Sequence, residues 1–143
     1  MANSHLVILK EPYLSMILKD RKRIELRLHK TRRPVFGCVW AGDKLFLKAS
    51  SGPVRATATA RVVKNYENLT PKQILEIKRL YNHDIAGPDE YWRDKMDCKF
   101  GFLVWLKDVK PIKPVRIDMK GRRVWVVLKR GKDFGLLKKN RPR

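Results

Sequence analysis

The sequence predicts a small α+β domain, a mixed β-barrel of about five to six strands with two or three helices. Short segments of alternating apolar and polar residues indicate strands, and segments with helical spacing lie between them. The chain has 143 residues, of which 43% are hydrophobic, so it can bury one core of ordinary size. We therefore expect a single domain over residues 1–128, followed by a basic tail over residues 129–143.

Six segments have strand patterns. Residues 6–9 and 100–106 are short and almost continuously apolar, which is typical of buried strands. Residues 23–29 and 54–62 alternate, so each directs one apolar face toward a core. Residues 44–48 and 124–128 are the remaining candidates, and Pro111 and Pro114 interrupt the connection between the last two strands.

Three segments have the signals of helix starts. Pro12 suits a first helical position, and the apolar spacing after it predicts a helix to about residue 19. Thr70 and Gln73 form the pattern of a capping box, ahead of a helix to about residue 82. A shorter helix is predicted after residues 87–89, running to about residue 96.

Net charge is the strongest functional signal. Lysine and arginine total 34 against 14 acidic residues, a formal charge of +20 with a pI near 10.4. Such a surplus repels itself in a folded protein, so a polyanionic partner is expected, with nucleic acid as the leading candidate. The alternative is a basic protein without such a partner. An anionic membrane surface is less favoured because no basic amphipathic helix stands out.

The chain shows no membrane or secretion signal. It has no apolar run of about 18 residues, and residues 1–5 lack the basic start and apolar stretch of a signal peptide. Cys38 and Cys98 are far apart and in no metal-like spacing, so two reduced cysteines are expected. We expect a cytoplasmic monomer.

A lysine, a glutamate and an arginine fall together around residue 25. Glu25 and Arg27 share the polar face of the strand over residues 23–29. Lys22 is at odd spacing from Glu25 and would point with the apolar residues, so we place it in the preceding turn, where its ammonium can reach Glu25. The alternative is a solvated surface salt bridge, which contributes about 0–1 kcal/mol.

This motif resembles the start of an ASCH (activating signal cointegrator homology) domain. Residues 11–13, Glu-Pro-Tyr, follow the first strand, and Lys-x-x-Glu-x-Arg falls at Lys22, Glu25 and Arg27. The resemblance continues through the small-residue turn of residues 49–53 and ends in the strand over residues 100–106 and the Asp-Val-Lys-Pro that follows it at residues 108–111. It covers residues 5–118 and implies the PUA-like fold.

The resemblance implies a barrel with a cleft into which the Lys/Glu/Arg motif projects, roofed by the turn of residues 50–53. The family is associated with RNA, which favours RNA over DNA, and some members hydrolyse acylated cytidine or cleave single-stranded RNA. Asp20 stands where the family motif has glycine, and aspartate tolerates a left-handed backbone better than most residues. Glu25 stands where the cytidine amidohydrolases have a threonine nucleophile, so their mechanism is not carried over intact.

In such a cleft, each motif residue has a chemical use. Lys22 can grip a phosphate or, if desolvated, act as a base. Arg27 can clamp a phosphate or a base edge, and Glu25 can orient Lys22 or accept hydrogen bonds from a nucleobase. Ser50 and Ser51, with the backbone N–H groups of their turn, can form a small anion nest, the alternative being a tight turn that requires glycine.

Aromatic and basic residues add candidate contacts. Most of the four tryptophans and four tyrosines are expected in the core, but we expect Tyr13 and Trp92, near helix starts, to be exposed and able to stack on a base. A set of basic residues is expected to follow a phosphate backbone, the alternative being a solvated surface. This set is Lys10, Arg21, Arg23, Lys30, Arg32, Arg33, Arg55, Lys129 and Arg130.

The histidines do not indicate a metal site. His5, His29 and His83 lack metal-ligand spacing and no acidic cluster accompanies them, so neither a metal nor an organic cofactor is indicated. The leading hypothesis is an RNA-binding module that takes a nucleotide or unpaired base in the cleft while a basic surface holds phosphates. The alternative is an enzyme of the same fold, a nuclease of single-stranded RNA or a hydrolase of modified nucleosides, with Lys22 and Glu25 as its acid/base pair. A third hypothesis is a protein-interaction module of the translation or transcription apparatus.

Overall fold

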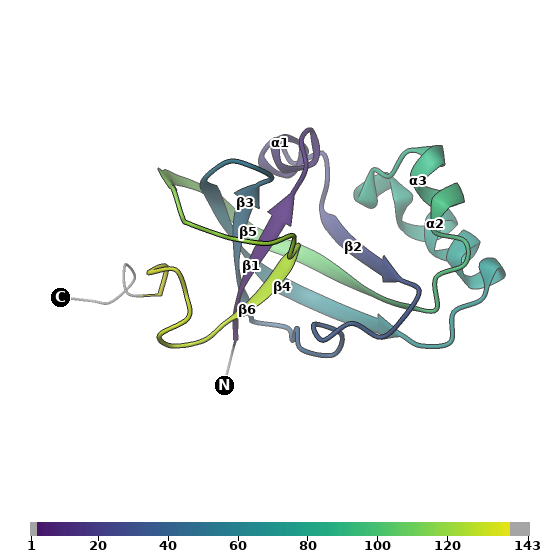
Figure 1. Cartoon of the computed structure of the whole chain (residues 1–143). Helices are drawn as coiled ribbons and strands as arrows, with labels where there is room; N and C mark the ends of the chain where they lie inside the picture. Colours follow the sequence, from purple (N-terminus) through teal and green to yellow (C-terminus); the bar gives the residue numbers. More distant parts are fainter. Residues whose placement is uncertain (1–2, 138–143) are drawn as a thin grey trace.

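Six strands form one curled, mixed sheet in the computed structural model, which describes residues 3–137 (Figure 1). They are β1 (Ser4–Leu9), β2 (Ile24–His29), β3 (Lys44–Ala49), β4 (Val54–Tyr66), β5 (Phe100–Val115) and β6 (Trp125–Leu128). The order in the sheet is β2-β5-β4-β3-β1-β6; β1 and β3 run parallel, and the other neighbours run antiparallel. The predicted α+β fold and its number of strands are confirmed, with the sheet curled into a half-barrel whose edges are β2 and β6.

Three helices accompany the sheet over these residues: α1 (Tyr13–Leu18), α2 (Pro71–Ile85) and α3 (Asp89–Asp94). α2 begins with the predicted capping box, since the Thr70 hydroxyl accepts from the Gln73 backbone N–H and the Gln73 side chain accepts from the Thr70 backbone N–H. Figure 1 shows α2 and α3 beside β2, at one end of the sheet. α2 and α3 therefore lie next to the strand that carries Glu25.

The main core lies on the inner face of the curled sheet. Ala56, Ala58 and Ala60 of β4 are buried there, in one cluster with Phe102 of β5 and Leu14 of α1. Alanine side chains are small, so neighbouring elements can approach β4 closely, as the alternation of residues 54–62 predicts. The same alternation leaves the intervening polar residues of β4 on the outer face.

β2 separates two environments. Its apolar residues Ile24, Leu26 and Leu28 pack in a second cluster with α2 and α3. Glu25 and Arg27 point to the opposite, inner side, because successive strand residues alternate between faces. The strand pattern therefore places the polar motif toward the interior of the half-barrel.

β5 is longer than predicted. It contains Pro111 and Pro114, although the sequence predicts that both lie in a connection between strands; that prediction is wrong. β2 pairs with β5 only from Phe100 to Trp105, and the rest of β5 pairs with β4 alone. A proline has no N–H to donate, so it is tolerated where one side of a strand is an open edge.

Part of the predicted basic tail packs on the domain. Leu136 is buried in a third cluster with Leu6, Phe46 and Val54, on the outer side of β1 and β3. The rest of that tail, residues 138–143, lies outside the described residues. Among residues 3–137, none of the helices has the length and apolar character needed to cross a membrane.

Candidate functional site

A cleft of about 600 Å³ opens between β2, the end of β1 and α3. Lys22, Glu25 and Arg27, the three residues of the sequence motif, all line it. Tyr13 of α1 and Tyr91 of α3 line it as well. The structure therefore brings the predicted motif together in one concave site.

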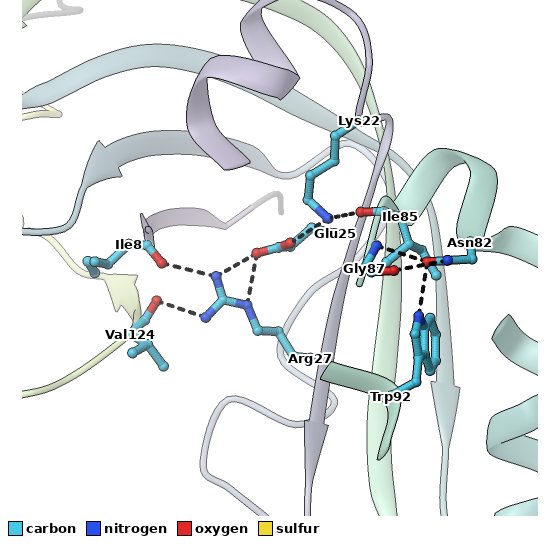
Figure 2. A network of polar contacts seen from close by, with 9 residues as sticks. All are labelled: Ile8, Lys22, Glu25, Arg27, Asn82, Ile85, Gly87, Trp92 and Val124. Carbon is cyan, nitrogen blue, oxygen red and sulfur yellow. Dashed lines mark hydrogen bonds and ion pairs between the residues drawn. The ribbon is translucent and has the colours of Figure 1, made fainter. Parts of the chain in front are cut away.

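Glu25 is the centre of a buried polar network (Figure 2). Its Oε2 accepts hydrogen bonds from Arg27 Nε at 3.0 Å and from Arg27 Nη2 at 2.6 Å. Its Oε1 lies 3.4 Å from Lys22 Nζ. The residue is only 6% exposed, so the carboxylate exchanges water for two cationic partners.

Lys22 occupies the turn before β2, as predicted, and its ammonium meets Glu25. Nζ also donates to the Ile85 carbonyl at 2.6 Å, which ties the turn to the end of α2. Asp20 adopts a left-handed backbone with φ 61°, the conformation that a glycine would favour at this position. Aspartate therefore keeps the turn that directs Lys22 into the cleft.

Arg27 joins the two edges of the sheet. From β2, its Nη2 donates to the Ile8 carbonyl of β1 at 3.1 Å, and its Nη1 lies 3.5 Å from the Val124 carbonyl, just before β6 (Figure 2). The guanidinium carbon lies 5.3 Å from the centroid of the Trp125 ring. One planar side chain thus closes the half-barrel where backbone pairing between β2 and β6 does not.

The charges of this network stabilise one another. Burial alone would raise the pKa of Glu25, but the positive charges of Arg27 and Lys22 outweigh burial and lower it. Burial lowers the pKa of Lys22, while Glu25 opposes that shift. Glu25 is therefore a carboxylate near neutral pH and a weak proton acceptor.

The walls of the cleft carry groups with unused hydrogen-bonding capacity. Among residues 3–137, neither the Tyr13 nor the Tyr91 hydroxyl has a hydrogen-bond partner in the protein. Burial and the nearby Glu25 charge raise the pKa of Tyr91, so its phenol keeps its proton. Burial, followed by the positive charges of Arg33, Lys95 and Arg27, lowers the pKa of His29 to about 4, so this imidazole is neutral near pH 7.

Several lining residues were missed by sequence reasoning. Glu90, Tyr91, Asp94 and Lys95 come from α3 and the turn after it, which fold over β2. No local pattern in the sequence indicates that α3 lies there. His29 is different, because the alternation of β2 already places it on the face of Glu25 and Arg27.

Trp92 is not exposed, and the prediction that it is exposed is wrong. It is 2% exposed, packed among the apolar residues that join α2 and α3 to β2. Its indole N–H donates to Asn82 Oδ1 at 3.0 Å, and the same oxygen accepts from the Gly87 N–H (Figure 2). Trp92 therefore anchors α3 and has no face free for a base. Tyr13 is half-buried and lines the cleft.

The turn of residues 50–53 does not line the cleft, contrary to the roof that the family resemblance implies. Ser50 and Ser51 are exposed, and Ser51 has a left-handed backbone with φ 60°. The Ser50 N–H donates to the Leu9 carbonyl and the Gly52 N–H to the Ala49 carbonyl. Two of the N–H groups required for an anion nest are thus already used within the fold.

The residues predicted to follow a phosphate backbone fall into two groups. Four of them form ion pairs, namely Arg23 with Asp20, Lys30 with Asp97, Arg32 with Glu67 and Arg55 with Glu11. The others are exposed and form no ion pair with the residues that the structure describes: Lys10, Arg21, Arg33, Lys129 and Arg130. Of the whole set, Lys10 lies at the cleft.

The curled sheet and its three helices define a small α+β fold of the PUA-like class. More specifically, the chain has the ASCH-domain fold. The crystal structure of ASCH from Zymomonas mobilis has a TM-score of 0.72 at 14% sequence identity, covering 94% of this chain and 94% of that chain. Two single-residue variants of that protein, also at 14% identity, give TM-scores of 0.72 and 0.70 over 94% and 95% of this chain and 96% and 95% of theirs. No family model and no curated protein matches the sequence.

Proposed function

We propose that this chain binds RNA and accepts an unpaired nucleotide in the cleft. The observation that carries the proposal is a concave site of about 600 Å³, within the size range of small-ligand sites, with a fixed polar floor and phenol-bearing walls. The formal charge of +20 supports a polyanion as the larger partner. The ASCH-domain fold supports an RNA-related role at the level of the fold alone.

The floor and the rim of the cleft have different tasks in this proposal. Lys22 and Arg27 direct their donors to Glu25 and to backbone carbonyls, so they shape the floor more than they grip a ligand. At the rim, Lys10 is exposed and Lys95 lies 5.6 Å from the Tyr91 ring centroid, and these two ammonium groups suit phosphates.

The groups suited to a base lie between them. The Tyr13 and Tyr91 hydroxyls and the neutral His29 ring can each donate or accept a hydrogen bond. Glu90 and Asp94 are acceptors that suit exocyclic amino groups of bases and disfavour phosphates. The cleft thus combines groups that can form hydrogen bonds with a base and two cations that can contact the phosphates of the RNA backbone.

The hydrolase alternative gains no support from the pair predicted to carry it. Glu25 lies between two cations that lower its pKa, so it is a poor general base. The Lys22 ammonium already donates to the Ile85 carbonyl. Binding is therefore the function that this geometry favours.

The test is fluorescence-anisotropy binding of a short labelled single-stranded RNA, with the DNA counterpart and a salt series, and with the RNA checked on a gel. We expect a Tyr91→Phe, Lys95→Gln variant to bind about tenfold more weakly, since it has neither that hydroxyl nor that ammonium for the ligand. Arg93→Gln is the control, because Arg93 is exposed on the same helix and does not line the cleft. Equal affinity of all three proteins would refute binding in the cleft, and shortened RNA with wild type alone would favour the hydrolase.

A further inference from the structure

The outer face of the sheet is the face opposite to Glu25 and Arg27. The C-terminal segment covers this face over β1 and part of β3, and the uncovered part around the middle of β4 is basic. On β4, Ala58 is buried in the inner core, so the adjacent Thr57 and Thr59 point outward. Both threonines are partly exposed. The middle of β4 therefore presents a solvent-accessible surface that is distinct from the cleft.

Strand register brings lysines to this surface from both sides. Thr59 pairs with Lys44 of β3 and with Lys107 of β5, and Thr57 pairs with Lys110 of β5. Side chains of directly paired residues lie on the same face of a sheet. Because neighbouring strands are about 4.8 Å apart, the backbones of Lys44 and Lys107 are about 10 Å apart across Thr59.

This surface lacks compensating negative charge. β3, β4 and β5 contain one acidic residue, Asp108, next to eight basic ones: Lys44, Lys48, Arg55, Arg61, Lys64, Lys107, Lys110 and Lys113. Arg55 pairs with Glu11. Within residues 3–137, no ion pair is formed by Lys44, Arg61, Lys107 or Lys110. A group of cations without ion pairs on one face of a sheet favours the approach of a polyanion.

An exposed tryptophan lies in the turn that leads into β3. Trp40 is 68% exposed, although its backbone N–H is fixed by Asp43 Oδ2 at 2.9 Å. The turn is joined to β4 by the Gly42 N–H bonded to the Ala60 carbonyl at 2.7 Å. This bond places the turn beside the bulge of β4, where Arg61 and Val62 are both exposed. An exposed indole offers a face on which an unpaired base can stack.

We propose that these five residues, Lys44, Arg61, Lys107, Lys110 and Trp40, bind a stretch of single-stranded RNA outside the cleft. The cations contact phosphates, and Trp40 stacks on an unpaired base. An unpaired strand is favoured over a duplex because stacked base pairs offer no free base face to an indole. This proposal extends the proposed function to a second surface and does not require that the cleft be occupied.

The experiment compares four proteins with a labelled oligouridine of about 20 nucleotides, longer than one small domain covers. They are wild type, Trp40→Ala, the quadruple variant Lys44→Gln, Arg61→Gln, Lys107→Gln, Lys110→Gln, and a control that removes equal charge elsewhere. The control is Lys19→Gln, Lys72→Gln, Arg93→Gln, Lys99→Gln, at four exposed positions without ion pairs among the described residues.

We expect Trp40→Ala to weaken binding about tenfold, and the quadruple variant to reduce the salt slope by about 0.7 for each phosphate that it no longer neutralises. The control should retain most of the affinity and most of the salt slope. Equal reductions in the quadruple variant and the control would overturn the proposal, because charge alone would then explain binding. So would unchanged affinity in Trp40→Ala, or tighter binding of a duplex than of the single strand.

A second titration, with cytidine monophosphate by calorimetry, separates this surface from the cleft. A mononucleotide is small enough for the cleft, so its affinity should be the same in wild type, Trp40→Ala and the quadruple variant. If only the Tyr91→Phe, Lys95→Gln variant loses mononucleotide binding, the result supports nucleotide binding in the cleft. If wild type does not bind the mononucleotide, nucleotide binding in the cleft is refuted. The oligouridine experiment still decides in that case whether the outer face binds RNA. Thermal melting of every variant confirms that each is folded.

Discussion

At the scale of single residues, Glu25 determines whether the buried Lys22 and the partly buried Arg27 are tolerated. Arg27 and Lys22 both contact its carboxylate, and Lys22 is only 5% exposed. A buried ion pair adds little stability compared with an apolar replacement, but removing one partner leaves the other charge buried and uncompensated. Replacing Glu25 alone should therefore cost more stability than the ion pairs themselves contribute.

We expect Glu25→Gln to lower the free energy of unfolding by about 3–5 kcal/mol, because the amide keeps the shape of the side chain but not its charge. Urea unfolding measures the change. Glu76→Gln is the control, since Glu76 pairs with Arg79 on the exposed side of α2, and this substitution should leave stability unchanged. A decrease no greater than that of the control would show that the Lys22 and Arg27 charges need no counter-charge.

At the scale of elements, one buried histidine connects three parts of the sheet. His5 of β1 donates from Nε2 to Asp43 Oδ2 at 2.8 Å, and its Nδ1 accepts from the Trp125 indole N–H of β6 at 3.1 Å. An indole nitrogen can only donate, so Nδ1 must be unprotonated and the ring neutral. Asp43, before β3, also accepts from the backbone N–H groups of Asn3 and Trp40.

Acid should therefore weaken the fold by protonating His5. Burial lowers the pKa of His5 although Asp43 opposes the shift, so the unfolded chain binds more protons than the folded one. The resulting stability is fully present above the unfolded value of about 6.5 and is lost as pH falls below it. We expect the urea concentration at the unfolding midpoint to decrease as the pH is lowered from neutral to about 5. This pH range lies above the one in which carboxylates titrate.

Variants of the other histidines assign this effect. His29, whose pKa is also lowered, contributes in the same window, so His29→Gln should remove only part of the acid sensitivity. His83→Gln, at an exposed position of α2, is the control for the loss of one histidine. Midpoints that stay constant between neutral pH and about pH 5 in His29→Gln would contradict the role given to His5.

Element by element, the sequence predicts what local chemistry dictates. The capping box at Thr70 and the alternation of residues 23–29 each depend on neighbours within a few positions, and the structure has both features. The extent of β5 depends on β4, a long-range partner that makes Pro111 acceptable at an edge. The periodicity of the β5 segment does not show that β2 pairs with only its first six residues while β4 continues to pair beyond them.

At the scale of the whole molecule, local sequence patterns likewise predict the contacts between near neighbours in the site but not those between distant residues. Lys22 meets Glu25 three positions away, which spacing and the family resemblance predict. The bond from Lys22 to Ile85 spans 63 positions, and Tyr91 reaches the cleft only because α3 folds onto β2. The exposure of the tryptophans also depends on tertiary structure. Trp92 is buried because α3 packs against α2 and β2, whereas Trp40, in the turn before β3, is exposed.

The charge of the whole molecule also affects its stability. Eight ion pairs join lysine or arginine to acidic side chains within residues 3–137, but the net formal charge of the chain is +20, so most of its cations have no acidic partner. Repulsion among unpaired cations destabilises the compact state and is screened by salt, since the Debye length shortens from about 30 Å at 0.01 M to about 8 Å at 0.15 M. The thermal unfolding midpoint should therefore rise as sodium chloride is added over this range.

The charge-reduced proteins test that explanation. Both quadruple variants lower the net charge by four, from +20 to +16, so each should unfold at a higher temperature than wild type at low salt and depend less on salt. The outer-face variant should gain more, because register places Lys44 and Lys107 in one row. The four control positions are distributed over the chain, with Lys72 on α2, Arg93 on α3, Lys19 just after α1 and Lys99 just before β5. A midpoint that falls with added salt would mean that attraction in the ion pairs exceeds repulsion among the other cations.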